Sequence, residues 1–174
     1  MDEEKLDNMQ KHENYREQFQ RLKKALDNGF DLEAIFIEYA ILEDRTESIL
    51  RHGGKWQAYL KKIKGKEPNI TTKVQYIQKS AECKKDIAHR YFSDNLLDGI
   101  LQWKDERNRL IHALLKQQLK PHEVACIAQK GAELTKLLRT RAGSYNRALE
   151  RIAKQAAVQK TAVDAISEEF TEDE

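Results

Sequence analysis

The stretch LLDGILQWKDERNRLIHALL, residues 96–115, decides the predicted fold of this chain. Its apolar residues recur at spacings of three and four, which is typical of one buried face of an α-helix. They are Leu96, Leu97, Ile100, Leu101, Trp103, Leu110, Ile111, Leu114 and Leu115. Arg107 lies four residues after Trp103 and three before Leu110, so it falls on the same face. Because burying an unpaired charge is costly, an arginine at that position needs a partner or a function.

Similar apolar spacing predicts helices on both sides of this stretch. We expect helices over residues 11–28, from Asp31 to about Arg51, around Trp56–Ile63, from Thr71 or Thr72 to about Tyr91, from a cap at Ser93 to about Leu119, and from Pro121 onward. Gly143–Ser144 is expected to break or kink the last helix, and residues 61–70 are expected to form a mobile basic loop. No segment has the pattern of a strand. The sequence therefore predicts an all-α fold, an antiparallel bundle of four to five helices.

Length and composition place limits on the class of protein. A chain of 174 residues is expected to form one domain. We expect a bundle over residues 11–155, between a frayed acidic N-terminus at residues 1–10 and an acidic, disordered tail at residues 156–174. No apolar run approaches the roughly 20 residues of a membrane span, and the first residues do not resemble a signal peptide. We therefore expect a cytoplasmic protein that does not interact with membranes.

The charge is distributed unevenly along the chain. Residues 1–50 hold 7 Lys/Arg and 13 Asp/Glu, residues 51–160 hold 24 and 10, and residues 161–174 hold none and 6. A basic middle between acidic ends suits a polyanionic partner such as RNA, although solvated helix surfaces would give the same count. The densest basic run provides the expected contacts to an RNA backbone, or else a solvated loop: Lys61, Lys62, Lys64 and Lys66.

The polar residues within the decisive stretch suit the chemistry of RNA cleavage. Attack by a ribose 2′-hydroxyl needs a base, an acid for the leaving 5′-oxygen, and a cation near the phosphorane. Histidine acts as acid or base near neutral pH, which makes His112 the expected proton carrier. Arg107 is the expected phosphate stabiliser, Arg109 a secondary phosphate contact and Asn108 a positioning amide.

The motif Arg107-Asn108-Arg109-Leu110-Ile111-His112 resembles the signature of the HEPN superfamily. In that signature four to six residues separate an arginine from a histidine, and the residue directly after the arginine is usually polar. The resemblance covers roughly residues 11–155. It implies an all-α bundle, metal-independent endoribonuclease activity that leaves a 2′,3′-cyclic phosphate, and a homodimer. One toxin branch of the family has a tyrosine two residues after the histidine, which a partner enzyme modifies. Here that position is Leu114, so any antitoxin protein must act by another route.

Helix geometry also favours a dimer. Five residues on a straight helix turn through about 140° and rise about 7.5 Å. Arg107 and His112 therefore point in different directions, and a compact site forms more easily where two copies meet across a two-fold axis. The two histidines then divide the roles of base and acid.

The sequence leaves other interpretations open. Arg107 would be structural if it paired with Glu106, Asp105 or an acidic residue of the second helix, and His112 would then be a satisfied core histidine. The leading hypothesis is a metal-independent endoribonuclease for single-stranded RNA, in a toxin or phage-defence setting. The alternative is a non-catalytic module that binds RNA, a nucleotide or a protein, or a plain scaffolding bundle. Neither a cofactor nor a metal is expected, because no His/Cys cluster accompanies the acidic group on the second helix, which comprises Glu38, Glu43, Asp44 and Glu47.

Overall fold

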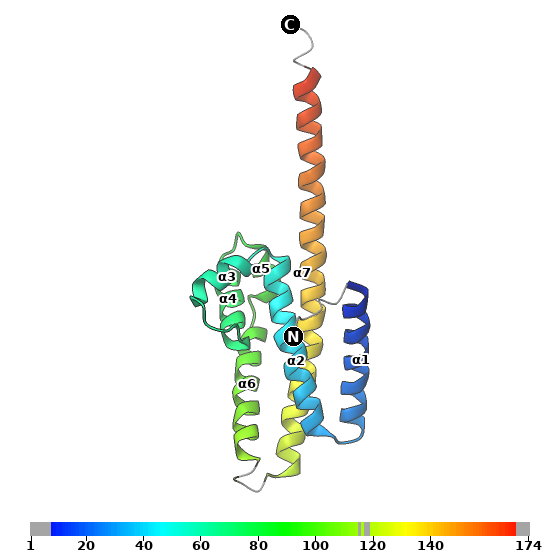
Figure 1. Ribbon diagram of the computed structural model, residues 1–174, viewed down its shortest axis with the longest axis vertical. Helices are drawn as coiled ribbons and strands as arrows, with labels where there is room; N and C mark the ends of the chain where they lie inside the picture. Colours follow the sequence, from blue (N-terminus) through cyan, green and yellow to red (C-terminus); the bar gives the residue numbers. More distant parts are fainter. Residues whose placement is uncertain (1–7, 115, 117–118, 170–174) are drawn as a thin grey trace. The chain divides into compact units, whose positions relative to one another are not determined.

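The computed structural model describes residues 8–114, 116 and 119–169, and this part of the chain is all α-helical (Figure 1). It contains seven helices and no strand: α1 (Asn8–Asp27), α2 (Asp31–His52), α3 (Trp56–Ile63), α4 (Ile70–Glu82), α5 (Ile87–Phe92), α6 (Leu96–Ala113) and α7 (Pro121–Glu169). The predicted all-α class is thereby confirmed. The expected four to five main helices become seven, because one predicted helix is divided and the short helix expected around Trp56–Ile63 is present as α3.

The chain divides into two compact units, whereas one bundle is expected over residues 11–155. Unit 1 comprises Met1–Arg45 and Asn95–Leu138, and unit 2 comprises Thr46–Asp94 and Arg139–Glu174. The long helices α2 and α7 each contribute residues to both units. Each unit is therefore assembled from segments that are far apart in the sequence.

The core of unit 1 contains five of the nine apolar residues in the stretch 96–115 that the sequence predicts to be buried. Leu101, Ile111 and Leu114 are only half-buried, and Leu115 lies outside the described residues. Leu97, Ile100 and Trp103 are fully buried, and Leu110 is nearly so. Trp103 also satisfies its polar atom, because its indole Nε1 donates a hydrogen bond of 2.9 Å to the backbone oxygen of Ile127. This bond ties α6 to α7 within unit 1 and fixes the register in which the two helices present their side chains.

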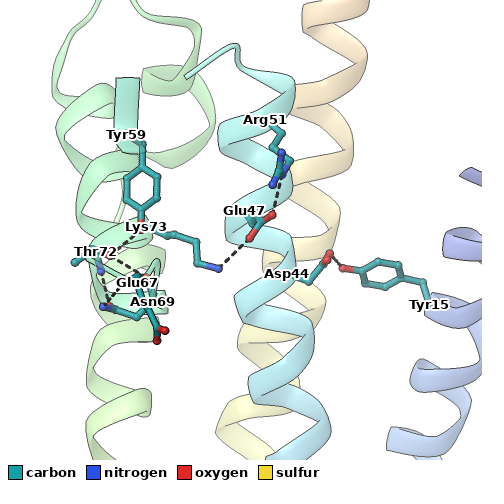
Figure 2. Close-up of polar contacts among 9 residues, drawn as sticks. All are labelled: Tyr15, Asp44, Glu47, Arg51, Tyr59, Glu67, Asn69, Thr72 and Lys73. Carbon is teal, nitrogen blue, oxygen red and sulfur yellow. Dashed lines mark hydrogen bonds and ion pairs between the residues drawn. The ribbon is translucent and has the colours of Figure 1, made fainter. Parts of the chain in front are cut away.

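Unit 2 is held together by polar contacts as well as by apolar ones (Figure 2). Lys73 on α4 is almost fully buried and lies 3.4 Å from the carboxylate of Glu47 on α2, which also accepts a 2.8 Å bond from Arg51. Tyr145 on α7 is buried against the rings of Tyr91 and Phe92. Burial, with a contribution from Asp86, raises the pKa of Tyr145 to about 12.

Several predicted helix boundaries are wrong. The helix expected from a cap at Ser93 to about Leu119 extends only from Leu96 to Ala113, after Asn95. Two boundaries in unit 2 also differ. The helix expected from residue 71 or 72 to Tyr91 is divided at Cys83–Asp86, where Asp86 caps α5 by accepting a hydrogen bond from the Ala88 amide. Asn69, rather than Thr71 or Thr72, caps α4, because its side chain accepts from the Thr72 amide. A short aspartate or asparagine side chain can accept a hydrogen bond from a backbone amide two or three residues further on, in place of a helical carbonyl. These side-chain bonds fix where α4 and α5 begin.

The last helix also differs from expectation. It runs without a break through Gly143–Ser144 and continues to Glu169, which includes residues 156–169 of the tail that was expected to be disordered. A single helical glycine costs only about 1 kcal/mol, which neighbouring helix formers offset. Residues 153–160 are rich in Ala, Gln and Lys, which favour helix. The rest of the tail, residues 170–174, and residues 1–7 lie outside the described residues.

Candidate functional site

Helix α6 carries the four residues of the predicted site in its last two turns. The helix follows Asn95 and has an acidic residue, Asp98, in its first turn and His112 in its last turn. This charge order matches the helix dipole and favours a helix over this segment. Arg107, Asn108, Arg109 and His112 therefore keep the angular spacing of a regular α-helix.

The Arg107 guanidinium lies over two aromatic rings of α2. Its central carbon is 4.5 Å from the ring centroid of Tyr39 and 5.3 Å from that of Phe36. An arginine over an aromatic face is attracted by the quadrupole of the ring and keeps its N–H groups directed outward in the plane of the guanidinium. Burial raises the pKa of Tyr39, Glu43 raises it further, and the positive charge of Arg107 opposes both effects.

Arg107 has no carboxylate partner among the described residues. Its Nη1 donates a hydrogen bond of 3.2 Å to Asn108 Oδ1, and its buried Nε has no partner. The neighbouring carboxylates pair elsewhere: Glu106 lies 2.8 Å from Lys130, and Asp105 lies 2.6 Å from Lys104. The interpretation in which Arg107 pairs with Glu106, Asp105 or an acidic residue of α2 is therefore wrong.

His112 and Arg109 are both exposed, so His112 is not a satisfied core histidine. Arg109 lines a hollow of about 490 Å³ between the end of α6 and the start of α7, together with Glu106 and His122. Neither Arg107 nor His112 lines this hollow. The structure thus brings Arg107 and Asn108 into contact, and it places Arg109 on a different part of the α6 surface.

The aromatic support of Arg107 is the feature that sequence reasoning missed. Periodicity predicts that Phe36 and Tyr39 face inward with Ile35, but Phe36 is 51 % exposed. Nearly every residue from Ala34 to Leu42 is apolar, so the pattern does not identify one face of α2. Leu32, one turn before Phe36, is also exposed, and the two form an apolar strip on α2.

The acidic group of α2 does not act as one cluster. Glu38 is fully buried in unit 1, and neither of its carboxylate oxygens has a hydrogen-bond partner in the described part of the chain. Asp44 accepts a hydrogen bond from the Tyr15 hydroxyl (Figure 2). Glu47 belongs to unit 2, where it pairs with Lys73 and Arg51. No group of three or more His, Cys, Asp or Glu in the described ranges is arranged to hold a metal ion.

The predicted backbone-binding lysines lie in unit 2, around the C-terminus of α3. Lys61 and Lys62 belong to the last turn of α3, so the loop expected over residues 61–70 begins only at Lys64. Lys64 has a left-handed backbone with φ 51°, and Gly65 follows with φ 78°. All four lysines are exposed, and none forms an ion pair with a described carboxylate.

None of the described helices is both long enough and apolar enough to span a bilayer. Comparisons of the chain with protein-family models, with curated proteins and with solved structures found no significant match.

Proposed function

We propose that this chain is a metal-independent endoribonuclease that cleaves single-stranded RNA as a homodimer. His112 acts as acid or base on the 2′-hydroxyl or the 5′-oxygen. Arg107 stabilises the charge that develops on the phosphate, and Asn108 holds the guanidinium in place. Arg109 provides a secondary phosphate contact.

The observation that carries the proposal is that Arg107 is half-buried and has no carboxylate partner among the described residues. A half-buried guanidinium without a carboxylate partner is costly unless it meets an anion from outside the chain. The stack on Tyr39 and Phe36 fixes its direction without neutralising its charge. A fixed and uncompensated guanidinium suits a phosphodiester, because it can donate two parallel hydrogen bonds to the phosphate oxygens.

The exposed strip of Leu32 and Phe36 supports the homodimer. These side chains lie on α2, and Phe36 is the ring that also contacts Arg107. An exposed apolar strip beside a charged site is typical of an interaction surface. A second copy placed there brings its own α6 to the same region. Arg107 and His112 of one helix point about 140° apart, and the motif of the partner copy then faces this one. One site can therefore use side chains from both copies.

The test is an RNA cleavage assay in EDTA with the purified full-length chain. We expect cleavage of labelled single-stranded RNA and a 2′,3′-cyclic phosphate on the 5′ product. His112→Ala should lower the rate by at least about a hundredfold, the usual size of a general acid–base contribution. His52→Ala is the matched control, since His52 is an exposed histidine of α2 that neither belongs to the motif nor lines the hollow beside Arg109. Wild-type cleavage that His112→Ala leaves unchanged, or no cleavage at all, contradicts the proposal.

A second candidate is a non-catalytic module that binds RNA or a nucleotide. It is favoured by the charge of unit 2, which holds 17 Lys/Arg and 12 Asp/Glu, with 6 of the 12 acidic residues confined to residues 161–174. RNA binding that weakens as the salt concentration rises, without cleavage, would select this candidate.

The family resemblance extends the main proposal to a toxin or phage-defence setting, in which an antitoxin protein neutralises the chain. Expression of the wild-type chain in bacteria should then slow growth, whereas expression of His112→Ala should not. Equal growth of the two strains at equal protein levels contradicts this setting. It does not test the cleavage reaction, which the RNA assay measures.

A further inference from the structure

Unit 2 contains a cavity of about 280 Å³ between α3, the loop that follows it, and the first turns of α4. Its charged lining consists of three lysines, Lys62, Lys64 and Lys66, and no acidic residue lines it. None of the three lysines forms an ion pair with a carboxylate in the described residues. Three like charges around one small cavity repel one another, and a bound anion would relieve this repulsion.

The backbone after α3 brings these lysines to the cavity. Lys64 and Gly65 are both left-handed, and the Lys64 amide donates to the Lys61 oxygen to close the last turn of α3. Lys66 follows this turn and lines the same cavity as Lys62. Lys62 also lies 5.2 Å from the ring centroid of Tyr76, which holds its ammonium group on the α4 side.

Polar groups of Tyr59, Asn69 and Thr72 also line the cavity, and they bond to one another (Figure 2). Buried Tyr59 forms a 2.8 Å hydrogen bond with Thr72 Oγ1, and the Thr72 amide donates to Asn69 Oδ1 at 3.1 Å. The Thr72 hydroxyl donates its proton to the backbone oxygen of Asn69, so Thr72 Oγ1 accepts the hydrogen bond from the Tyr59 hydroxyl. Because these groups satisfy one another, they hold the shape of the cavity and leave the lysines to bind a ligand.

We propose that this cavity binds the phosphate monoester of a nucleotide, supplied either by a free nucleotide or by the 5′ end of an RNA strand. Lys62, Lys64 and Lys66 contact the phosphate oxygens as point charges. The half-buried ring of Tyr76 offers a stacking surface for the base. The volume suits one nucleotide and lies just below the range of about 300–1,000 Å³ that is typical of small-molecule sites. The site is separate from the α6 motif and does not depend on cleavage.

Calorimetric titration of the full-length chain tests the proposal with two pairs of probes. The first pair is AMP and adenosine. The second is one 2′-O-methyl oligonucleotide with a 5′-phosphate or a 5′-hydroxyl, which the proposed reaction cannot cleave because it lacks 2′-hydroxyls. We expect the phosphorylated member of at least one pair to bind about tenfold more tightly or better, a difference typical of hydrogen bonds between charged groups. A preference in the first pair identifies a free nucleotide, and a preference in the second identifies an RNA end.

Two double variants separate the cavity from general basic charge. Lys64→Gln/Lys66→Gln should abolish the preference for the phosphorylated member. Lys84→Gln/Lys85→Gln removes the same charge from exposed lysines of unit 2 that do not line the cavity, and it should keep the preference. All four lysines are exposed, so both variants should keep the helical circular dichroism of the wild type. The proposal is overturned if neither phosphorylated probe is preferred, or if the Lys84/Lys85 variant loses the preference equally. Neither result depends on whether the α6 motif cleaves RNA.

Discussion

The carboxylate of Glu38 on α2 occupies the space that a side chain at Gly131 on α7 would fill. A Cβ at residue 131 would overlap this carboxylate and would lie 2.8 Å from Cε2 of Trp103. The absence of a side chain at Gly131 therefore lets α2, α6 and α7 approach closely within unit 1. The same close approach leaves a carboxyl group in a core that offers it no hydrogen-bond partner among the described residues.

Gly131→Ala should destabilise the protein by about 1–3 kcal/mol, the usual cost of overpacking a core. Gly143→Ala is the matched control on the same helix. There the nearest atom to a Cβ is Arg147 Nη1 at 3.6 Å, which is ordinary contact, so the alanine should be neutral or should stabilise by up to about 1 kcal/mol. Urea denaturation followed by circular dichroism measures both variants. Equal effects of the two substitutions would show that the space at Gly131 is not tightly filled.

Glu38 should make stability depend on pH. Burial, with a contribution from Asp31, raises the pKa of Glu38 from 4.5 to about 8. Between these values the unfolded chain releases the proton that the folded chain retains. The free energy of unfolding should therefore fall as the pH rises from about 4.5 to about 8, by a few kcal/mol in total. Above the folded pKa this loss is complete.

Glu38→Gln tests this dependence, because glutamine has a similar shape and does not titrate. The variant should lose most of the decline in stability between pH 5 and pH 8 that the wild type shows in urea denaturation at each pH. Glu33→Gln is the control, since Glu33 on α2 forms a surface pair with Arg21. An unchanged pH profile in Glu38→Gln would mean that the carboxyl group meets water or an undetected partner.

The helical fold is largely predictable from the sequence, because it depends on local signals. The apolar spacing of residues 96–110 identifies the buried face of α6, and Leu97, Ile100 and Trp103 lie on it as predicted. The division at Cys83–Asp86 was not predicted, because a local capping bond there outweighs a continuous apolar pattern. The division into two units was not predicted either, because periodicity shows which residues are buried and not which helices share a core.

The site is less predictable than the fold, because its properties come from contacts distant in sequence. The motif residues are visible in the sequence, but the rings of Phe36 and Tyr39 that hold Arg107 come from another helix with apolar residues on several faces. The basic run of residues 61–66 is also visible. The cavity beside this basic run is also lined by Asn69 and Thr72 of the following segment. Its presence depends on how α4 packs in unit 2, which the sequence pattern does not show.

Tyr39 should position Arg107 for catalysis. Tyr39→Leu removes the ring that lies 4.5 Å from the guanidinium, and we expect cleavage in EDTA to slow by about tenfold, in line with a cation–π energy of roughly 1–2 kcal/mol. Tyr39→Phe keeps the ring face and should retain most of the activity. Equal losses in the two variants would show that the hydroxyl, and not the ring, matters.

Phe36→Glu should weaken the proposed homodimer. Its side chain is 51 % exposed, so the substitution should change the stability of the isolated chain by less than about 1 kcal/mol. A carboxylate in an apolar interface is costly to desolvate, so sedimentation velocity should show a shift toward monomer. Ile152→Glu is a matched control with 52 % exposure on α7. If both variants sediment like the wild type, or both dissociate equally, Phe36 is not at the interface.

If two copies share one catalytic site, an inactive copy should inhibit an active one. A fixed amount of wild-type protein, mixed and re-equilibrated with excess His112→Ala, would then exist mostly in mixed dimers with one histidine, and its cleavage rate should fall by at least about tenfold. The double variant Phe36→Glu/His112→Ala is expected not to dimerise, so the same excess should leave the rate unchanged. Copies with independent sites would instead keep their full activity in mixed dimers. An unchanged rate with excess His112→Ala, under conditions where mass spectrometry detects mixed dimers, would therefore exclude the shared site even if His112 is catalytic.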